Sequence, residues 1–236
     1  MGRQRSKSKG KKFALNEPYF NMSQIDPITS NQRRVWDEFD YGQNLFLHGI
    51  AGTGKTFVSC YLAMTEVLER GSMYKNLTIV RSVVPTRDIG FLPGTEEQKT
   101  EVYEQPYKSI FNSIFQRGDA YELLRRKNAV NFLTTSYIRG ITLEDTIVVV
   151  DECQNLNFHE LDSIITRLGD NCRIIFCGDF RQSDFTNGRE KSGINDFINI
   201  IKKLNGFSFI NFTADDIVRS DLVKSYIIEK ERQGIA

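Results

Sequence analysis

The chain alternates between short apolar runs and longer segments in which apolar residues recur every three to four positions. Short continuous runs are typical of strands buried on both faces, and the longer pattern is typical of helices with one buried face. The runs predict strands at residues 45–47, 77–80, 130–133, 146–150, 173–177 and 207–211. The longer pattern predicts helices at residues 55–70, 106–118, 119–127, 157–168, 196–204 and 221–231. Asp119 and Asn157 are the predicted N-caps of two of these helices, and Glu160 lies in capping-box register with Asn157. No internal repeat or linker divides them, so we expect one α/β domain with a mainly parallel, doubly wound sheet.

A glycine-rich loop follows the first predicted strand. It matches the pattern G-x-x-x-x-G-K-[ST] and consists of Gly49, Ile50, Ala51, Gly52, Thr53, Gly54, Lys55 and Thr56. Glycines let successive backbone amides point at phosphate oxygens, and the helix that follows adds the positive end of its dipole. Lys55 can reach the β- and γ-phosphates, and the Thr56 hydroxyl can ligate Mg²⁺. The alternative is a glycine turn that matches by chance, which the flanking strand and helix disfavour.

Two carboxylates end the most apolar of the predicted strands. Residues 147–150 are four consecutive β-branched residues, and Asp151 and Glu152 follow them directly. Carboxylates at the end of a buried strand are costly unless they face a cation or water. We therefore predict that Asp151 holds Mg²⁺ or its water, and that Glu152 orients and deprotonates an attacking water. An ordinary acidic turn is the alternative.

Three further polar residues have an open interpretation. Gln32 lies in a helix that Thr29 or Ser30 caps, and a carboxamide shortly before such a loop can read adenine, although spacing alone favours an exposed helical residue. Gln182 follows the strand at 173–177 and can sense a γ-phosphate or belong to a plain turn. Arg219 precedes the last helix, where it can form a surface ion pair or act as an arginine finger.

The composition is that of a globular protein, with 40% hydrophobic and 26% charged residues. No apolar run reaches the length of a membrane span, and the first residues lack the apolar core of a signal peptide. The four cysteines form no C-x-x-C pair and are expected to be buried thiols in a reducing compartment. The sequence has two histidines, which does not favour a histidine-based metal site. These features favour a cytoplasmic location.

Basic charge is concentrated at the start of the chain. Six of the 31 Lys and Arg residues lie within residues 1–12, which contain no acid, so 25 basic residues remain against 30 acidic ones. We expect residues 1–25 to be a disordered tail and residues 26–236 to form the domain. The tail can hold RNA or DNA through phosphate contacts or can simply keep the protein in solution.

Several longer stretches resemble the PhoH-like ATPases, and particularly the short phage-type members. The resemblance covers most of residues 29–228 and rests on TSNQ, GIAGTGKT, IVRSVVPTRDIGFLPGTEEQK, YEQPY, YIRGITLED, IVVVDECQN, ITRLGDNCRIIFCGDFRQSD and DIVRSDLV. The run from Arg81 to Gly94 and the GDFRQ element are more specific than a phosphate-binding loop. The long glycine–proline loop at residues 82–95 is expected to carry function. In YIRGITLED, Ile141 stands where many members have Arg, so a substrate role of that loop does not carry over.

The resemblance implies a RecA-like core related to the motor lobes of superfamily-one helicases, with ATP and Mg²⁺ as cofactors. It makes Gln32 the adenine-reading residue, Gly49 to Thr56 the nucleotide loop, and Asp151 and Glu152 the metal and water carboxylates. It assigns Asp179 and Gln182 to the third helicase motif and places Arg219 near the γ-phosphate.

The chain is long enough for one such lobe. We therefore expect a neighbouring chain to supply Arg219 and so complete the site. The resemblance points the same way, to a homo-oligomer in the form of a hexameric ring. The expected activity is Mg²⁺-dependent ATP hydrolysis coupled to RNA or single-stranded nucleic acid. A small-substrate P-loop kinase and a nucleotide-dependent assembly module without motor activity are the alternatives.

Overall fold

A single parallel sheet forms the centre of the molecule. The structure is a computed structural model that describes residues 21–82, 96–180 and 188–234. The strands are β1 (Asn44–Gly49), β2 (Asn76–Arg81), β3 (Val130–Thr134), β4 (Thr146–Asp151), β5 (Arg173–Gly178) and β6 (Phe207–Phe212). They lie in the order β3-β2-β4-β5-β1-β6, and every pair is parallel. The predicted α/β class with a parallel, doubly wound sheet is confirmed.

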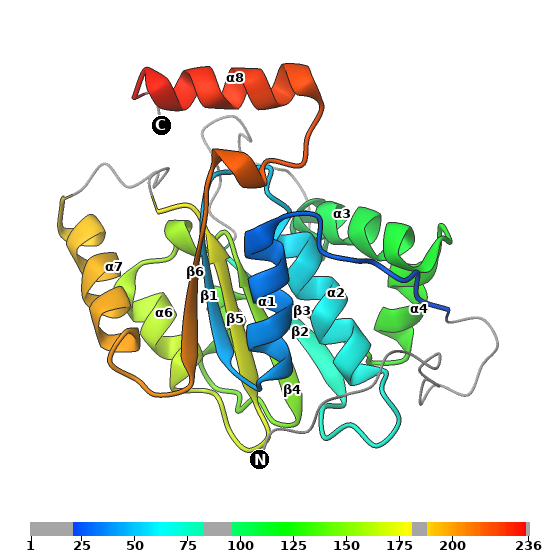
Figure 1. The fold of residues 1–236 in the computed structure, drawn as a ribbon. Helices are drawn as coiled ribbons and strands as arrows, with labels where there is room; N and C mark the ends of the chain where they lie inside the picture. The colour runs from blue at the N-terminus through cyan, green and yellow to red at the C-terminus, as the bar shows by residue number, and fades with distance from the viewer. Residues whose placement is uncertain (1–20, 83–95, 181–187, 235–236) are drawn as a thin grey trace, which may run out of the picture.

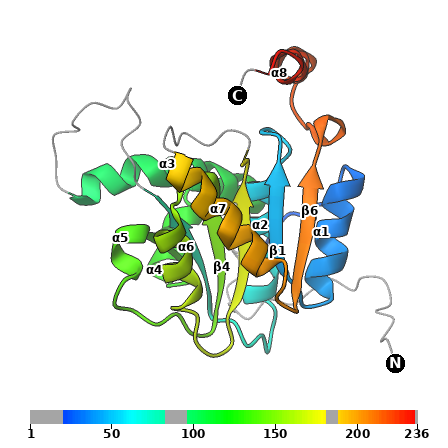
Figure 2. The same ribbon diagram turned by 90° about the vertical axis from the view of Figure 1, so that its left-hand side faces the viewer.

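Helices cover both faces of this sheet (Figures 1 and 2). One face packs against α1 (Ser30–Asp40), α2 (Lys55–Val67), α3 (Glu96–Phe115) and α4 (Ala120–Arg126). The other packs against α5 (Thr135–Ile138), α6 (Phe158–Ile165) and α7 (Gly188–Ile201). Two short 3-10 turns, η1 (Cys153–Asn155) and η2 (Ala214–Asp216), follow β4 and β6. The last helix, α8 (Asp221–Arg232), lies beyond the carboxyl ends of the strands rather than on either face.

The apolar character of the strands follows from this double coverage. In β4, Ile147 and Val149 belong to the core beneath α1 to α4, whereas Val148 and Val150 belong to the core beneath α5 to α7. Every residue of β4 and of β5 is buried. A strand with two buried faces cannot alternate between apolar and polar residues, which is why its sequence is a continuous apolar run.

Helix boundaries differ from the predictions where a proline or a polar segment hides them. The helix predicted to begin at residue 106 begins at Glu96, and Pro106 lies inside it. Proline suits a first helical turn, so the sequence pattern placed the start there. Packing of the fully buried Tyr107, Phe111 and Ile114 against the core holds the helix together beyond the proline. The four-residue α5 was not predicted because so few residues show no periodicity.

The helix caps confirm one prediction and correct another. At α6, the Asn157 side chain accepts a hydrogen bond from the Glu160 amide, and the Glu160 side chain accepts one from the Asn157 amide, which is the predicted capping box. At α4, Asp119 occupies the predicted N-cap position, but its side chain makes no cap hydrogen bond. It pairs instead with Arg117, whose Nε donates to Asp119 Oδ1 at 2.6 Å.

The folded body reaches further toward the amino terminus than residue 26. Met22 and Ile25 pack against the core, and the Ser23 amide donates to the Ile114 carbonyl at 2.8 Å. The basic residues at positions 1–12 lie outside the described residues. Within the described ranges, no helix has the length and apolarity needed to cross a membrane.

Candidate functional site

The predicted loop and the predicted carboxylates meet around one cavity at the carboxyl ends of the strands. The cavity has a volume of about 780 Å³, within the usual range for small-molecule sites. β5 separates β1, which leads into the loop, from β4, which leads into the carboxylates. Parallel strands bring these ends to one edge of the sheet, where ligands of such folds bind. The site residues that line the cavity are Gln32, Ala51, Gly52, Thr53, Gly54, Lys55, Thr56, Asp151, Glu152, Asp179 and Arg219.

The loop begins at a position that only glycine can occupy. Gly49 has φ +127°, and a Cβ added there would lie 2.1 Å from the Phe212 carbonyl oxygen of the neighbouring strand β6. Ile50 follows as a buried residue beneath the loop. The absence of a side chain at Gly49 is therefore what lets β1 and β6 stay paired up to the start of the loop.

We expect Gly49→Ala to lower the free energy of unfolding by roughly 2–6 kcal/mol, because backbone strain costs roughly 1–3 kcal/mol and forced packing a similar amount. Urea denaturation followed by circular dichroism measures the loss. Gly42→Ala is the matched control, since Gly42 also has a positive φ of +82° but nothing within 4 Å of an added Cβ. Its cost should be roughly 1–2 kcal/mol. Equal losses for the two variants would contradict the steric role of Gly49.

Lys55 places a buried positive charge under the loop. Its Nζ donates to the carbonyl oxygens of Gly49 and Ile50 at 2.7 and 2.8 Å and to Thr53 Oγ1 at 3.3 Å. Burial lowers the pKa of Lys55 against the opposing effect of nearby acidic groups, Asp179 and Glu152 among them. An anion that enters the cavity would offset this cost of burying the ammonium group, so the loop favours an anionic ligand.

Thr56 and Asp151 lie in direct contact although they are far apart in the sequence. Thr56 Oγ1 donates to Asp151 Oδ1 at 2.7 Å, and Asp151 is 5% exposed. A hydroxyl and a carboxylate are the hard oxygen donors that Mg²⁺ prefers when substrate phosphates complete its coordination. Among the described residues there is no cluster of three or more His, Cys, Asp or Glu that could form an all-protein metal cage. The residues present therefore fit Mg²⁺ bound together with a phosphate ligand.

A glutamine that the sequence patterns did not single out holds the second carboxylate. Gln154 Nε2 donates to Glu152 Oε2 at 2.5 Å, and Gln154 Oε1 accepts from the backbone amide of Asp179 at 3.0 Å. Gln154 is 6% exposed, and Glu152 has φ +50°, which is uncommon for a residue other than glycine. The bridge joins the ends of β4 and β5 and fixes the orientation of Glu152. Its only sequence signal was its place two residues after Glu152.

Gln32 is not an exposed helical residue. It is 4% exposed, its Oε1 accepts from the Ile28 amide at 2.9 Å, and its Nε2 donates to the Thr53 carbonyl at 3.0 Å. The Thr29 side chain caps α1, as one of the two predicted caps. Gln32 thus links α1 to the glycine-rich loop, residues 49–56, at the edge of the cavity.

Arg219 lies beside the loop of its own chain. The Val218 amide donates to the Gly52 carbonyl at 3.0 Å, and Arg219 Cγ lies 3.1 Å from the position of a Cβ added to Gly52. The site therefore does not require a neighbouring chain in order to have this arginine close to it. Gln182 and residues 83–95 of the predicted loop lie outside the described residues.

Comparison with known proteins adds a family to this geometry. The family described as PhoH-like protein matches residues 24–229. The chain belongs to the PhoH-like family. It is 30% identical over 208 residues to a PhoH-like protein of Mycobacterium bovis, covering 86% of this chain and 57% of that protein. It is 30% identical over 206 residues to a PhoH-like protein of Bacillus subtilis, covering 87% and 64%. The PhoH-like chain thus spans less than two thirds of the length of these curated relatives.

Two solved structures illustrate more distant likeness. The Pif1 helicase from Bacteroides in complex with ADP-AlF3 and ssDNA is 16% identical with a TM-score of 0.43, over 91% of the PhoH-like chain and 48% of that protein. The Hef helicase domain of Pyrococcus furiosus is 13% identical with a TM-score of 0.42, over 79% and 39%.

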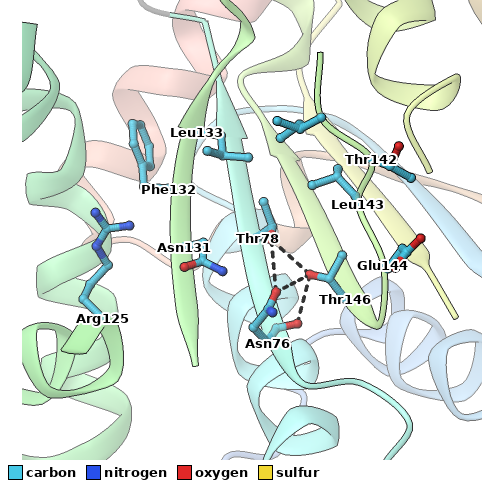
Figure 3. Close-up of a pocket in the computed structure, with 11 residues that line it drawn as sticks. Asn76, Thr78, Arg125, Asn131, Phe132, Leu133, Thr142, Leu143, Glu144 and Thr146 are labelled. Carbon is cyan, nitrogen blue, oxygen red and sulfur yellow. Dashed lines mark hydrogen bonds between the residues drawn. The ribbon is translucent and has the colours of Figure 1, made fainter. Parts of the chain in front are cut away.

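The PhoH-like chain has a second hollow at the opposite, amino-terminal ends of β2, β3 and β4 (Figure 3). Its volume is about 330 Å³. Its floor is a hydrogen-bonded group in which Thr78 Oγ1 lies 3.0 Å from Thr146 Oγ1, and both hydroxyls donate to Asn76 Oδ1. These bonds join β2 to β4 and satisfy the buried hydroxyls. The polar floor of this hollow is therefore explained by hydrogen bonding between strands. The cavity of about 780 Å³ beside residues 49–56 remains the candidate site.

Proposed function

We propose that this PhoH-like chain is a Mg²⁺-dependent ATPase. The observation that carries the proposal is the direct contact between Thr56 and Asp151 beside the buried Lys55 loop, with Glu152 held in place next to them. Thr56 and Asp151 would hold Mg²⁺, which would supply positive charge to neutralise the negative charge that develops on the phosphates. A cavity that offers an ammonium group, two hard oxygen donors and an oriented carboxylate has the parts required for phosphoryl transfer to water.

Each residue then has a distinct task. Lys55 and the amides of residues 49–56 bind the phosphates, and Thr56 and Asp151 hold the metal. Glu152 accepts a proton from the attacking water. Gln182 senses the γ-phosphate, and Arg219 stabilises the negative charge of the transition state. Gln32 holds the loop through Thr53 and reads the base.

Gln154→Ala should lower kcat by up to about 100-fold, the cost of misplacing a reacting group, while the Kd for ATP stays nearly unchanged. The reason is that Glu152 loses the amide that orients it, whereas no phosphate-binding group is altered. Steady-state hydrolysis and equilibrium binding of a fluorescent ATP analogue measure the two quantities. Gln233→Ala is the control, because Gln233 lies at the exposed end of α8 and its side chain donates to Glu229 on the same helix. An unchanged kcat for Gln154→Ala would contradict the orienting role.

We also propose that hydrolysis is coupled to RNA or single-stranded nucleic acid and that the protein works as a homo-oligomer, a hexameric ring. The basic residues at positions 1–12 support nucleic-acid contact through phosphates. An intermolecular contact is supported by α8, which has no buried residue and exposes Leu222 at 81% and Tyr226 at 68%. A large apolar surface on a single helix is typical of an interaction site. The same helix gives weight to the alternative of a nucleotide-dependent assembly module.

The deciding experiment is steady-state ATP hydrolysis with Mg²⁺ or with EDTA, titrated first with single-stranded RNA and then with single-stranded DNA. Lys55→Ala serves as the blank. Mg²⁺-dependent hydrolysis that is absent from the blank supports the ATPase. Stimulation by one polymer identifies the nucleic acid to which hydrolysis is coupled. Tight ATP binding without hydrolysis, accompanied by a change in mass on light scattering, would favour the assembly module. A small-substrate kinase would instead show ADP release only with an added acceptor.

A further inference from the structure

Asp151 has a second hydroxyl partner that the catalytic scheme does not use. Tyr107 of α3 is 0% exposed, and its Oη donates to Asp151 Oδ2 at 2.7 Å. Thr56 donates to the other oxygen, Oδ1, at 2.7 Å. Each carboxylate oxygen therefore accepts a hydroxyl from a different helix. Rotation of the carboxylate would break both hydrogen bonds, so α2 and α3 together fix its plane.

Arg81 stands behind this tyrosine. It lies opposite Asp151 in the register between β2 and β4, and it interacts electrostatically with Tyr107 and with Asp151. Burial lowers the pKa of Arg81, but the interactions with Tyr107, Asp151 and Glu152 outweigh this effect and raise it. A positive guanidinium close to a phenol polarises the phenol hydroxyl, which strengthens its hydrogen bond to the carboxylate. The three side chains form a row from Arg81 through Tyr107 to Asp151.

Packing alone does not explain a tyrosine at this position. The Tyr107 ring packs against Phe132 with centroids 5.6 Å apart, within an otherwise apolar core. A phenylalanine ring would fill the same space without a hydroxyl, which is costly to bury unless it has a hydrogen-bond partner. The hydroxyl has its partner in Asp151, to which it donates.

We infer that Tyr107 is a positioning residue that orients Asp151 for Mg²⁺, and that Arg81 supports it from behind. The inference rests on the proposed metal role of Asp151. Partners that orient metal ligands typically change metal affinity about 10- to 100-fold when removed. Tyr107 should therefore set how tightly Mg²⁺ is held with the nucleotide, without touching the nucleotide itself.

The test compares Tyr107→Phe with Tyr121→Phe in the full chain. Tyr121 is the matched control, since it is 1% exposed and its Oη also donates to a carboxylate, Glu104 Oε2, at 2.5 Å, but away from the cavity. Binding of a fluorescent ATP analogue is titrated with Mg²⁺ and then repeated in EDTA. For Tyr107→Phe we expect an apparent Mg²⁺ affinity about 10- to 100-fold weaker, with binding in EDTA unchanged. Tyr121→Phe should match the wild type.

Unchanged Mg²⁺ affinity in a folded Tyr107→Phe would overturn the inference, and so would an equal loss in both variants. If Tyr107→Phe does not fold, Arg81→Met tests the same row of side chains, and a Mg²⁺ affinity identical to that of the wild type would count against it. A wild-type chain that binds the analogue equally well with and without Mg²⁺ would overturn the proposed metal role of Asp151 itself. Wild-type Mg²⁺ dependence with an unaffected Tyr107→Phe would overturn only the role of Tyr107.

Discussion

Arg219→Ala is expected to lower kcat for ATP hydrolysis by about 10³- to 10⁵-fold, the range measured for arginine fingers, while the Kd for ATP changes little. Arg219 lines the cavity, and its side chain lies against Gly52 of the glycine-rich loop. Its charge would stabilise the transition state more than the bound substrate, because negative charge shifts as the γ-phosphoryl group leaves. Single-turnover hydrolysis together with equilibrium nucleotide binding separates the two effects.

Arg232→Ala is the control for this variant. Arg232 ends α8 and its side chain is 80% exposed, so its loss should leave turnover unchanged. Unchanged turnover in Arg219→Ala would refute the transition-state role. Mixing Arg219→Ala with Lys55→Ala then distinguishes two geometries. Recovery of activity would mean that one chain supplies Arg219 to the loop of another, whereas continued inactivity would mean that Arg219 serves its own chain, as its position beside Gly52 favours.

Glu152→Gln should lower kcat about 10²- to 10⁴-fold, the usual contribution of a general base, and should leave ATP trapped on the protein. The carboxamide has nearly the shape of the carboxylate but cannot take a proton from water at neutral pH. Gln154 would still bridge to the end of β5 through its bond with the Asp179 amide. Filter binding of radiolabelled ATP and product analysis of the retained nucleotide measure the trapped fraction.

Glu144→Gln provides the matched loss of a carboxylate, because Glu144 lines the second hollow at the other ends of the strands. Its turnover should equal that of the wild type. If Glu152→Gln hydrolysed ATP as fast as the wild type, Glu152 could not be the general base. If neither the wild type nor Glu152→Gln hydrolysed ATP, the assembly module would replace the ATPase as the best explanation of the bound nucleotide.

Local patterns were sufficient to predict the elements that carry the site. The six strands, the loop from Gly49 to Thr56 and the carboxylates after β4 each occupy a few consecutive residues. Buried strands and tight glycine turns restrict the residue types within such short windows, so they leave a readable signal. The start of α3 left none, because a proline that suits a first turn lies in its interior.

The contacts among these elements had no comparable signal. Tyr107 and Asp151 are 44 positions apart, and Gln154 is 25 positions from Asp179, whose amide it accepts a hydrogen bond from. One hydrogen bond between distant residues imposes no period and no spacing on either segment. For the same reason, spacing favoured an exposed Gln32, whereas the structure buries it between α1 and the loop.

The sequence by itself therefore determined the α/β class, the family and the residue types proposed for a phosphate and a metal, because each depends on short-range chemistry. Only the tertiary structure decided that Arg219 lies at its own loop, that Gln154 holds Glu152 and that Tyr107 holds Asp151. These relations depend on strand order and on the packing of α3 against the sheet, which bring together side chains that no local pattern links.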